Sequence, residues 1–241
     1  MSKRKMDPGR LEKWVFWLLL CTLVASLAYA VVQVCRAPAA VAEGEPFAKL
    51  KSDYVLMVIQ CFSGILVVML PSVLERKWKL EIPSLITIMY FVFLYCAIYL
   101  GEVRSFYFKI PYWDMILHTF SGLMIGSLGF SVVNLLNKSS KPIALSPLFV
   151  AVFAFCFALG LGVLWEIYEF TMDGLMQTNM QKFALENGTA LLGREALADT
   201  MEDLIVDAVG ALVMSVIGYL SLKRNARWME RMSIRRRDGE A

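Results

Sequence analysis

Six apolar runs, each about 20 residues long, constrain the fold of this 241-residue chain more than any other feature. Runs of this length match the hydrocarbon thickness of a bilayer when they are helical. The chain is 58% hydrophobic, which is too apolar for an ordinary soluble domain. We therefore predict an all-α polytopic membrane helix bundle with about six transmembrane helices. The expected spans are residues 14–34, 54–73, 83–100, 112–136, 147–171 and 203–222.

Lysine and arginine placement predicts the orientation of the bundle. Taking alternate connections along the chain, one side carries 17 basic residues, both terminal tails included, and the other carries 7. Because cytoplasmic loops are enriched in Lys and Arg, we expect both termini in the cytoplasm. An even number of spans is consistent with this. The predicted localisation is the bacterial cytoplasmic (plasma) membrane, with a multi-pass, N-in/C-in topology.

The chain is expected to form a single integral-membrane domain over residues 1–241, with basic cytoplasmic tails at 1–13 and 223–241. Residues 14–111 carry little polarity within their spans, so we interpret them as packing helices 1–3. Residues 112–222 form the site-bearing helices 4–6. The basic tails favour contact with anionic membrane lipids over nucleic acid. A homo-oligomer is compatible with the sequence.

The last three spans each carry a polar stripe at helical spacing. Residues four apart lie on one face of a helix, so each stripe is acidic toward one end and small toward the other. Small residues let membrane helices approach closely. The stripes consist of Asp114, His118, Gly122 and Gly126; of Ala158, Gly162, Glu166, Glu169 and Asp173; and of Asp199, Asp203, Asp207, Gly210 and Ala211.

Alternating topology brings the three acidic ends to the same side of the membrane, which is the extracytoplasmic side in the predicted orientation. Carboxylates near lipid cost roughly 2.5–3.5 kcal/mol each at a helix centre, so they must face protein, water or a cation. Oxygen ligands with one imidazole suit Mg²⁺, Mn²⁺ or Zn²⁺. We predict a divalent metal ion as cofactor, with Glu169 or His118 as the acid–base group and Arg194 and Asp199 in support. The predicted metal ligands are Asp114, His118, Glu166, Asp203 and Asp207.

Four of these acids also have a simpler interpretation. Asp199 could be an N-cap or first-turn acid of the last helix, and Asp173 a solvated helix end. Glu166 and Glu169 could pair with Arg194 or Arg104 to hold the bundle together. The 26-residue connection 173–198 is long enough to fold over the mouth of the bundle or to form a short interfacial helix near residues 180–185.

Three motifs resemble the uncharacterised YjdF-like family of bacterial inner-membrane proteins. They are Trp113-Asp114-x-x-x-His118 with Ser121-Gly122, Trp165-Glu166-x-x-Glu169, and Leu192-Gly193 followed by the Asp199, Asp203 and Asp207 ladder. The resemblance covers residues 112–222. It implies a polytopic membrane protein and supplies no reaction.

The aspartate ladder is also similar to the aspartate-rich helices of intramembrane prenyltransferases and CDP-alcohol phosphotransferases, which hold Mg²⁺ on pyrophosphate. Thr200 stands where the first family has an aspartate, and the Asp-Gly-x-x-Ala-Arg core of the second is absent. Both similarities therefore concern metal binding only.

Three functions fit these patterns. The first is a metal-dependent enzyme that acts on a lipid-linked or phosphorylated substrate at the outer leaflet. The second is a proton- or cation-coupled transporter, although transporter sites more often lie near the midplane and between repeats. The third is a non-enzymatic bundle with a structural cation site.

Overall fold

The computed structural model confirms an all-α membrane bundle; it describes residues 7–39, 49–137, 144–185, 188–224 and 233–237. Among these residues, six helical segments are long and apolar enough to cross a membrane. The remaining elements are short. In chain order the elements are α1 (Pro8–Val34), α2 (Lys51–Val68), α3 (Leu70–Lys77), β1 (Leu80–Glu81), α4 (Ser84–Leu94), the π-helix η1 (Tyr95–Val103), α5 (Phe106–Lys109), α6 (Trp113–Leu136), α7 (Pro147–Met176), α8 (Arg194–Lys223) and β2 (Arg235–Arg236).

Several helices extend beyond the predicted apolar runs into flanking segments that carry polar residues. The second span comprises α2 and α3, and the third comprises α4 and η1. The largest difference is in α8, which begins at Arg194 although we predicted its span from residue 203. Gly193 is the N-cap residue, so Asp199 lies in the second turn and the N-cap interpretation of Asp199 is wrong. Hydropathy alone could not place this start, because the first turns of α8 carry acids.

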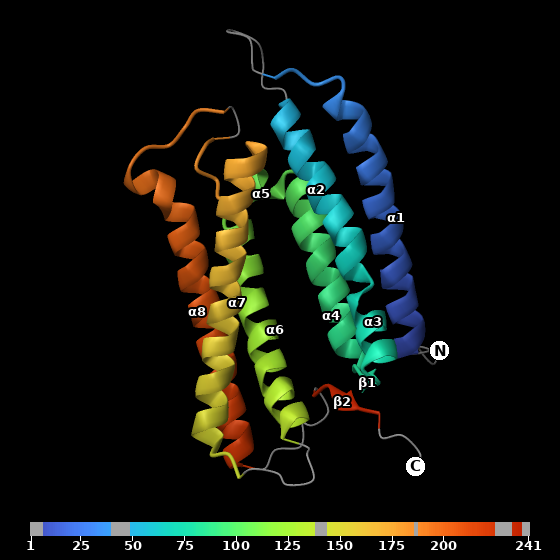
Figure 1. Ribbon diagram of the computed structural model, residues 1–241, viewed down its shortest axis with the longest axis vertical. Helices are drawn as coiled ribbons and strands as arrows, with labels where there is room; N and C mark the ends of the chain where they lie inside the picture. Colours follow the sequence, from blue (N-terminus) through green and yellow to red (C-terminus); the bar gives the residue numbers. More distant parts are fainter. Residues whose placement is uncertain (1–6, 40–48, 138–143, 186–187, 225–232, 238–241) are drawn as a thin grey trace, which may run out of the picture.

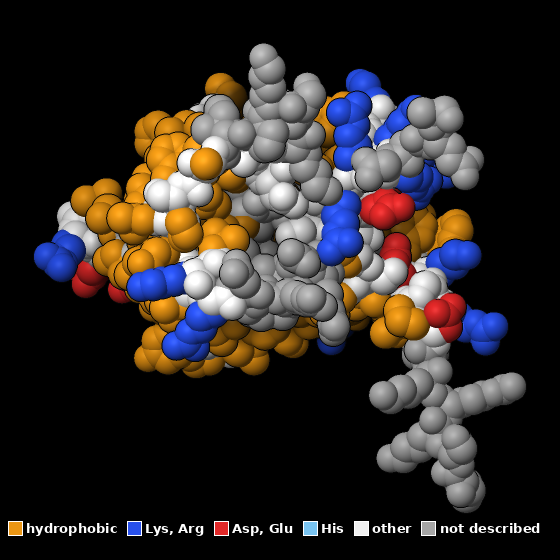
Figure 2. Space-filling view, turned by 90° about the horizontal axis from the view of Figure 1, so that it is seen from below, with side chains coloured by type: hydrophobic (Ala, Val, Ile, Leu, Met, Phe, Trp, Pro, Cys, Tyr) orange, Lys and Arg blue, Asp and Glu red, His pale blue; other side chains and the backbone are white. Residues whose placement is uncertain are grey.

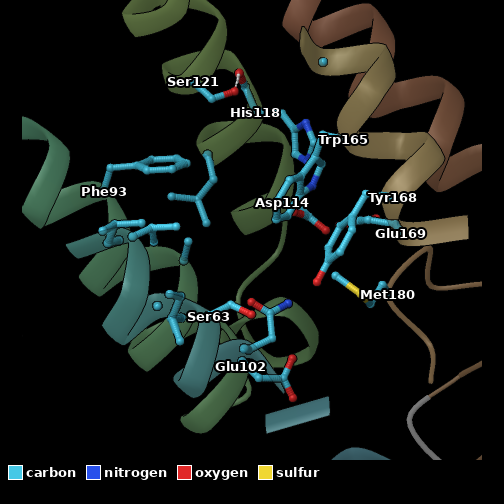
Figure 3. Close-up of a pocket in the computed structure, with 18 of the residues that line it drawn as sticks. Ser63, Phe93, Glu102, Asp114, His118, Ser121, Trp165, Tyr168, Glu169 and Met180 are labelled. Carbon is cyan, nitrogen blue, oxygen red and sulfur yellow. Dashed lines mark hydrogen bonds and ion pairs between the residues drawn. The ribbon is translucent and has the colours of Figure 1, made fainter. Parts of the chain in front are cut away.

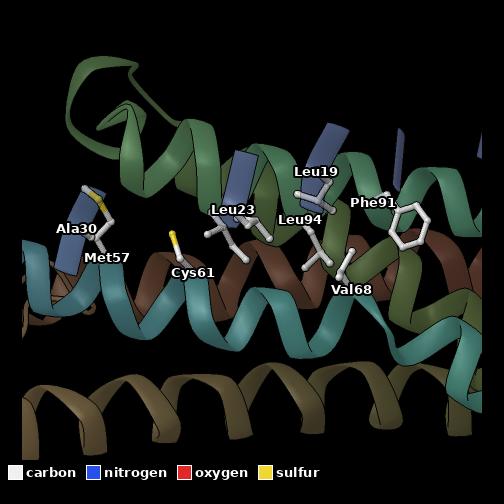
Figure 4. Close-up of a cluster of buried hydrophobic side chains, with 9 residues drawn as sticks. Leu19, Leu23, Ala30, Met57, Cys61, Val68, Phe91 and Leu94 are labelled. Atoms are coloured by element: carbon white, nitrogen blue, oxygen red, sulfur yellow. The ribbon is translucent and has the colours of Figure 1, made fainter. Parts of the chain in front are cut away.

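The helices form two groups, which Figure 1 shows side by side: α1, α2 and α4 with η1 in one, and α6, α7 and α8 in the other. The first group packs through large apolar side chains. Leu19, Leu23, Met57, Cys61 and Val68 are almost fully buried at its centre and meet side chains of α4 (Figure 4). Because such side chains would otherwise face lipid rather than water, this packing stabilises the group mainly through dispersion contacts.

The second group packs through small residues, as the sequence predicts. A β-carbon at Gly122 of α6 would lie 2.6 Å from the backbone oxygen of Asp207 on α8. A β-carbon at Gly210 of α8 would likewise overlap the backbone oxygen of Thr119 on α6. Because neither glycine has a side chain, the backbones of α6 and α8 can touch, as in other close membrane-helix pairs.

Both chain termini lie at the same end of the bundle (Figure 1). There β1 pairs antiparallel with β2, so residues 235–236 join the turn before α4. Figure 2 looks at this end and shows Lys and Arg side chains on it, with hydrophobic side chains around the flanks. Trp14, Trp17, Leu66 and Phe170 are more than half exposed on those flanks. Exposed apolar surface of this extent is typical of a lipid-facing protein.

Candidate metal centre

His118 lies at the centre of an acidic cluster formed by Asp114, Asp203 and Asp207. It projects from the second turn of α6 and is 8% exposed. Its Nε2 atom is 3.7 Å from Oδ1 of Asp114 and 3.7 Å from Oδ2 of Asp203. One ligand atom from each of these three residues lies within 4.8 Å of the other two. The structure thus brings three of the five predicted metal ligands together from α6 and α8.

Asp207 contacts the other ring nitrogen of His118. His118 Nδ1 is 3.2 Å from Oδ2 of Asp207, and the Ser121 hydroxyl donates to Oδ1 of Asp207 at 2.9 Å. If Nδ1 donates to this carboxylate, Nε2 of a neutral ring presents its lone pair toward Asp114 and Asp203. A carboxylate that receives the second ring N–H is the usual partner of a metal-binding histidine.

Small residues on all three helices permit this arrangement. Gly162 of α7 faces Asp207, and a β-carbon at Gly162 would lie 2.5 Å from Oδ2 of Asp207. With Gly122 and Gly210 holding α6 against α8, any larger residue at position 162 would push Asp207 from His118. The small-residue stripes therefore position the acids as well as pack the helices.

Glu166, the fourth predicted ligand, lies outside the group of three but is buried beside it. It is 5% exposed, and neither carboxylate oxygen has a hydrogen-bond partner among the described residues, although Gln181 and Thr200 lie alongside. Oδ2 of Asp199 is likewise buried without a partner there. Buried polar atoms are nearly always satisfied, so unpaired carboxylate oxygens require an explanation such as an ion, water or a proton.

Lys182 supplies a cation to the acidic cluster that no sequence pattern predicted. Its Nζ lies 3.2 Å from Oδ2 of Asp114, 2.9 Å from the carbonyl oxygen of Met180 and 4.5 Å from the ring centre of Tyr107. Burial lowers the pKa of Lys182, but the charges of Asp114, Asp199 and Glu169 outweigh burial and raise it well above the ordinary value. Lys182 is therefore protonated at neutral pH and offsets part of the acidic charge.

Tyr107 completes the surroundings of Lys182. Its ring lies against Gly101, where a β-carbon would be 2.5 Å from the ring. Burial first, and then the charge of Asp114, raise the pKa of Tyr107 well above its ordinary value, so its hydroxyl stays neutral. The neutral ring can thus face the Lys182 ammonium in a cation–π contact.

The connection between α7 and α8 differs from its prediction in two respects. Residues 180–185 do not form an interfacial helix; Ala184 and Ala190 instead make an antiparallel bridge. Asp173 is not a solvated helix end, because it is 8% exposed. It accepts hydrogen bonds from the Thr178 hydroxyl at 2.7 Å and from the backbone N–H groups of Met180 and Gln181 at 2.7 and 3.0 Å. Asp173 thereby fixes the segment that carries Lys182.

The predicted arginine partners of the acids lie elsewhere. The ion pairs found among the described residues include none from Arg194 or Arg104 to Glu166 or Glu169. Arg194 is exposed at the first position of α8. Glu169, the predicted acid–base residue, is 7% exposed and lines a cavity beside His118. Its predicted role, like that of Arg194, stays a prediction.

A cavity of about 550 Å³ adjoins the acidic cluster. Figure 3 shows Asp114, His118, Tyr168 and Glu169 on one side of it, and Phe93, Ser63 and Glu102 on the other. The two helix groups therefore each supply a wall. Such a volume lies within the ~300–1,000 Å³ typical of small-molecule sites.

Comparison with known proteins places the chain in a family of membrane proteins. An uncharacterised protein of Thermotoga maritima is 33% identical over 150 residues, which cover 62% of this chain and 69% of that protein. No solved structure matches the chain. The family model described as "Predicted membrane protein (DUF2238)" matches residues 14–224. The chain belongs to the DUF2238 family of membrane proteins.

Proposed function

We propose that this protein binds a divalent cation through Asp114, His118 and Asp203, with Asp207 orienting the histidine. The observation that carries the proposal is the position of His118 between two sets of carboxylates. Its Nδ1 faces Asp207 while its Nε2 faces Asp114 and Asp203. In a typical metal site of this kind, one ring nitrogen of the histidine donates to a carboxylate that fixes the ring, and the other nitrogen faces the metal together with the remaining ligands.

The distances support this assignment. Two ligands that each lie about 2.1 Å from a Zn²⁺ or Mg²⁺ ion are at most about 4.2 Å apart. The two Nε2–oxygen distances of 3.7 Å fall within that limit. Two carboxylates and one imidazole suit Zn²⁺ or Mn²⁺ better than Ca²⁺. We propose Glu166 as a further ligand or as a partner of metal-bound water, because its buried oxygens have no hydrogen bond among the described residues.

We further propose that the cation serves a metal-dependent enzyme acting on a lipid-linked substrate. The apolar cavity beside the acidic cluster supports the lipid-linked class over a water-soluble phosphorylated one. A bound divalent ion would polarise a substrate oxygen or lower the pKa of a water molecule. Glu169, which lines the cavity, would exchange protons with the substrate, and His118 is the other candidate for that role.

The proposed location of the site is the outer leaflet of a bacterial plasma membrane. α6 and α8, which carry the acidic cluster in their N-terminal halves, begin toward the end of the bundle opposite the termini (Figure 1). The end with the termini carries many basic side chains (Figure 2). The positive-inside rule favours a cytoplasmic position for that basic end. The predicted YjdF-like relationship is consistent with such a bacterial inner-membrane protein.

A cation-coupled transporter is the second candidate. The observation that favours it is the cavity between two helix groups, since transporter sites commonly lie between two bundles that move against each other. Ion flux in proteoliposomes that is abolished by Asp207→Asn, together with no hydrolysis of any lipid substrate, would select this candidate over the enzyme.

The direct test is metal content and Mn²⁺ affinity of the purified protein in detergent. We expect about one ion per chain in the wild type, and at least a hundredfold loss of Mn²⁺ affinity in Asp203→Asn and in His118→Ala. Glu195→Gln is the matched control, because Glu195 is exposed in the first turn of α8, and its Mn²⁺ affinity should match the wild type. Near-zero metal in the wild type and in both site variants would refute the proposal.

A further inference from the structure

The cavity beside the acidic cluster is divided into a polar end and an apolar arm. Glu102, Asp114, Glu169 and Lys182 line the polar end, near the loops between the spans. The arm continues toward the middle of the bundle, where large apolar side chains from both helix groups line it. These include Val67, Phe93, Leu94, Leu117, Ile125 and Leu161.

The length of the whole cavity, from its polar end to the tip of the apolar arm, matches one leaflet of a bilayer. Asp114 and Ile125 both line the cavity and lie eleven residues apart on α6, a rise of about 16 Å. Half of the ~30 Å hydrocarbon core is about 15 Å. A hydrocarbon chain that lies alongside α6 would therefore occupy the arm at the depth that it has in the surrounding lipid.

The polar end carries more acidic than basic side chains. Asp114 pairs with Lys182, and Asp207 pairs with His118. Glu102 and Glu169 form no ion pair among the described residues, although Lys49 donates to the backbone oxygen of Glu102 at 3.3 Å. Glu102 lies in the π-helix η1, an element that is frequent at functional sites.

Aromatic rings surround these carboxylates. Trp165 and Tyr168 of α7 line the cavity beside Glu169, with ring centres 5.2 Å apart (Figure 3). The contact of Lys182 with the Tyr107 ring shows that this end of the cavity already accommodates an ammonium over an aromatic face. Carboxylates and aromatic rings together are the recognition chemistry for amine and quaternary ammonium groups.

We propose that this cavity binds an amphiphile with a cationic amine head, held by Glu169 and Glu102, and a single apolar chain, held in the arm between α4 and α6. The proposal deepens the proposed function, because it names the substrate class of the cavity beside the metal site. It rests on the proposed function only for the chemistry that follows binding. Recognition of the amine uses carboxylates other than Asp114 and Asp203, so it is testable without metal.

The test is equilibrium binding of radiolabelled hexadecylamine to the purified protein in phosphatidylcholine nanodiscs, with hexadecanol and hexadecanoate as competitors. These three compounds share one chain and differ in head charge. We expect saturable binding of the amine and at least tenfold weaker competition by the alcohol and the acid. Equal competition by all three would overturn the assignment of a cationic head.

Two substitutions test separately the binding of the amine head and the binding of the apolar chain. Glu169→Gln should weaken amine binding at least tenfold and bring it close to that of the alcohol, whereas Glu195→Gln should change nothing. Ala97→Trp fills the arm and should abolish binding of amine and alcohol alike. Val92→Trp is its control on α4, because Val92 is 46% exposed on the lipid-facing surface. Unchanged binding in Ala97→Trp would show that the amphiphile does not occupy this cavity.

Mn²⁺ affinity measured on the same samples separates the two proposals. Ala97→Trp should retain wild-type Mn²⁺ affinity, which also shows that the variant folds. Amine binding with no Mn²⁺ binding in the wild type would refute only the metal proposal. Mn²⁺ binding that fails in Asp203→Asn, with no saturable amine binding in the wild type, would refute only the amphiphile proposal.

Discussion

The two helix groups of this protein solve the problem of packing in a membrane differently. In the group of α1, α2 and α4, large apolar side chains such as Leu19, Leu23 and Met57 fill the interior. In the group of α6, α7 and α8, glycines bring the backbones together and buried acids occupy the interior. The first arrangement maximises dispersion contacts, and the second gives up apolar contacts to place ionisable groups.

This difference indicates that the first group mainly stabilises the bundle, whereas the second group also positions the acidic residues. The first group can lose part of its core without moving His118, because the proposed metal ligands all lie on α6, α7 and α8. The second group cannot change its helix spacing without moving them. We therefore expect substitutions in the apolar core of the first group to change stability without changing metal affinity, and substitutions in the second group to change stability and metal affinity together.

The largest expected effect comes from Leu23→Ala. Leu23 is fully buried in the first group, so the substitution should lower the free energy of unfolding in detergent by about 2–5 kcal/mol. Mn²⁺ affinity of the folded protein should stay within about twofold of the wild type. A parallel loss of Mn²⁺ affinity would show that the two groups are coupled, and would contradict the view that the core of the first group affects stability only.

Gly210→Ala should have the next largest effect, in the second group. Its new β-carbon would overlap the backbone oxygen of Thr119 and force α6 from α8, at a cost of about 1–3 kcal/mol in unfolding free energy. Unlike Leu23→Ala, it should also weaken Mn²⁺ binding. Melting in detergent and Mn²⁺ titration measure the two effects.

Gly160→Ala on α7 is the matched control for the glycine substitution. A β-carbon at Gly160 would meet no described atom within 4 Å, so only helix propensity should change. Alanine is favoured over glycine in a helix by about 1 kcal/mol. A destabilised Gly160→Ala would mean that glycine is needed for a reason other than the approach of α6 to α8.

The helices and the acidic stripes could be predicted because both are local properties of the sequence. An apolar run of about 20 residues identifies a span whatever its neighbours, and i, i+4 spacing puts Asp114 under His118 on any α-helix. Alternating topology then places the acidic ends of α6, α7 and α8 at one end of the bundle, as the structure has them.

The surroundings of Lys182, Asp173 and Glu102 could not be predicted from the sequence, and the reason differs for each. Lys182 lies in an irregular connection that has no periodicity, and its partner Asp114 is 68 residues away. Asp173 resembles a solvated helix end until the following segment folds back over it. Glu102 follows the apolar run that was expected to end at residue 100, and the π-helix changes the face on which it lies. The cavity depends on packing between the two groups, which hydropathy does not specify.

Asp207→Asn tests whether this carboxylate orients His118 or binds the metal directly, as the sequence analysis predicts. A residue that orients a metal-binding histidine usually changes metal affinity by 10–100-fold, or about 1.4–2.8 kcal/mol. We expect a loss in that range, smaller than that of Asp203→Asn, in Mn²⁺ titrations. An equal loss in the two variants would identify Asp207 as a ligand and enlarge the proposed metal site.

The smallest effect is expected from Asp173→Asn, which tests whether the loop belongs functionally to the second helix group. The Asp173 carboxylate accepts three hydrogen bonds, two at Oδ1 from residues 178 and 180 and one at Oδ2 from residue 181. An amide can keep the two bonds to its oxygen but loses the third together with the charge, because its NH₂ group is a donor. Loss of charge assistance should cost about 1–2 kcal/mol, mostly as local opening of the loop rather than global unfolding. Hydrogen exchange of residues 178–182 should accelerate roughly tenfold, while exchange in α1 and α2 stays unchanged.

Mn²⁺ affinity gives a second measurement on the same variant. The loop holds Lys182 against Asp114, so Lys182 competes with Mn²⁺ for this carboxylate. Opening of the loop weakens that ion pair, and the Mn²⁺ affinity should therefore rise slightly or stay level. A fall in Mn²⁺ affinity would instead mean that the loop holds the metal site together, and that the second group needs its covering segment as much as its glycines.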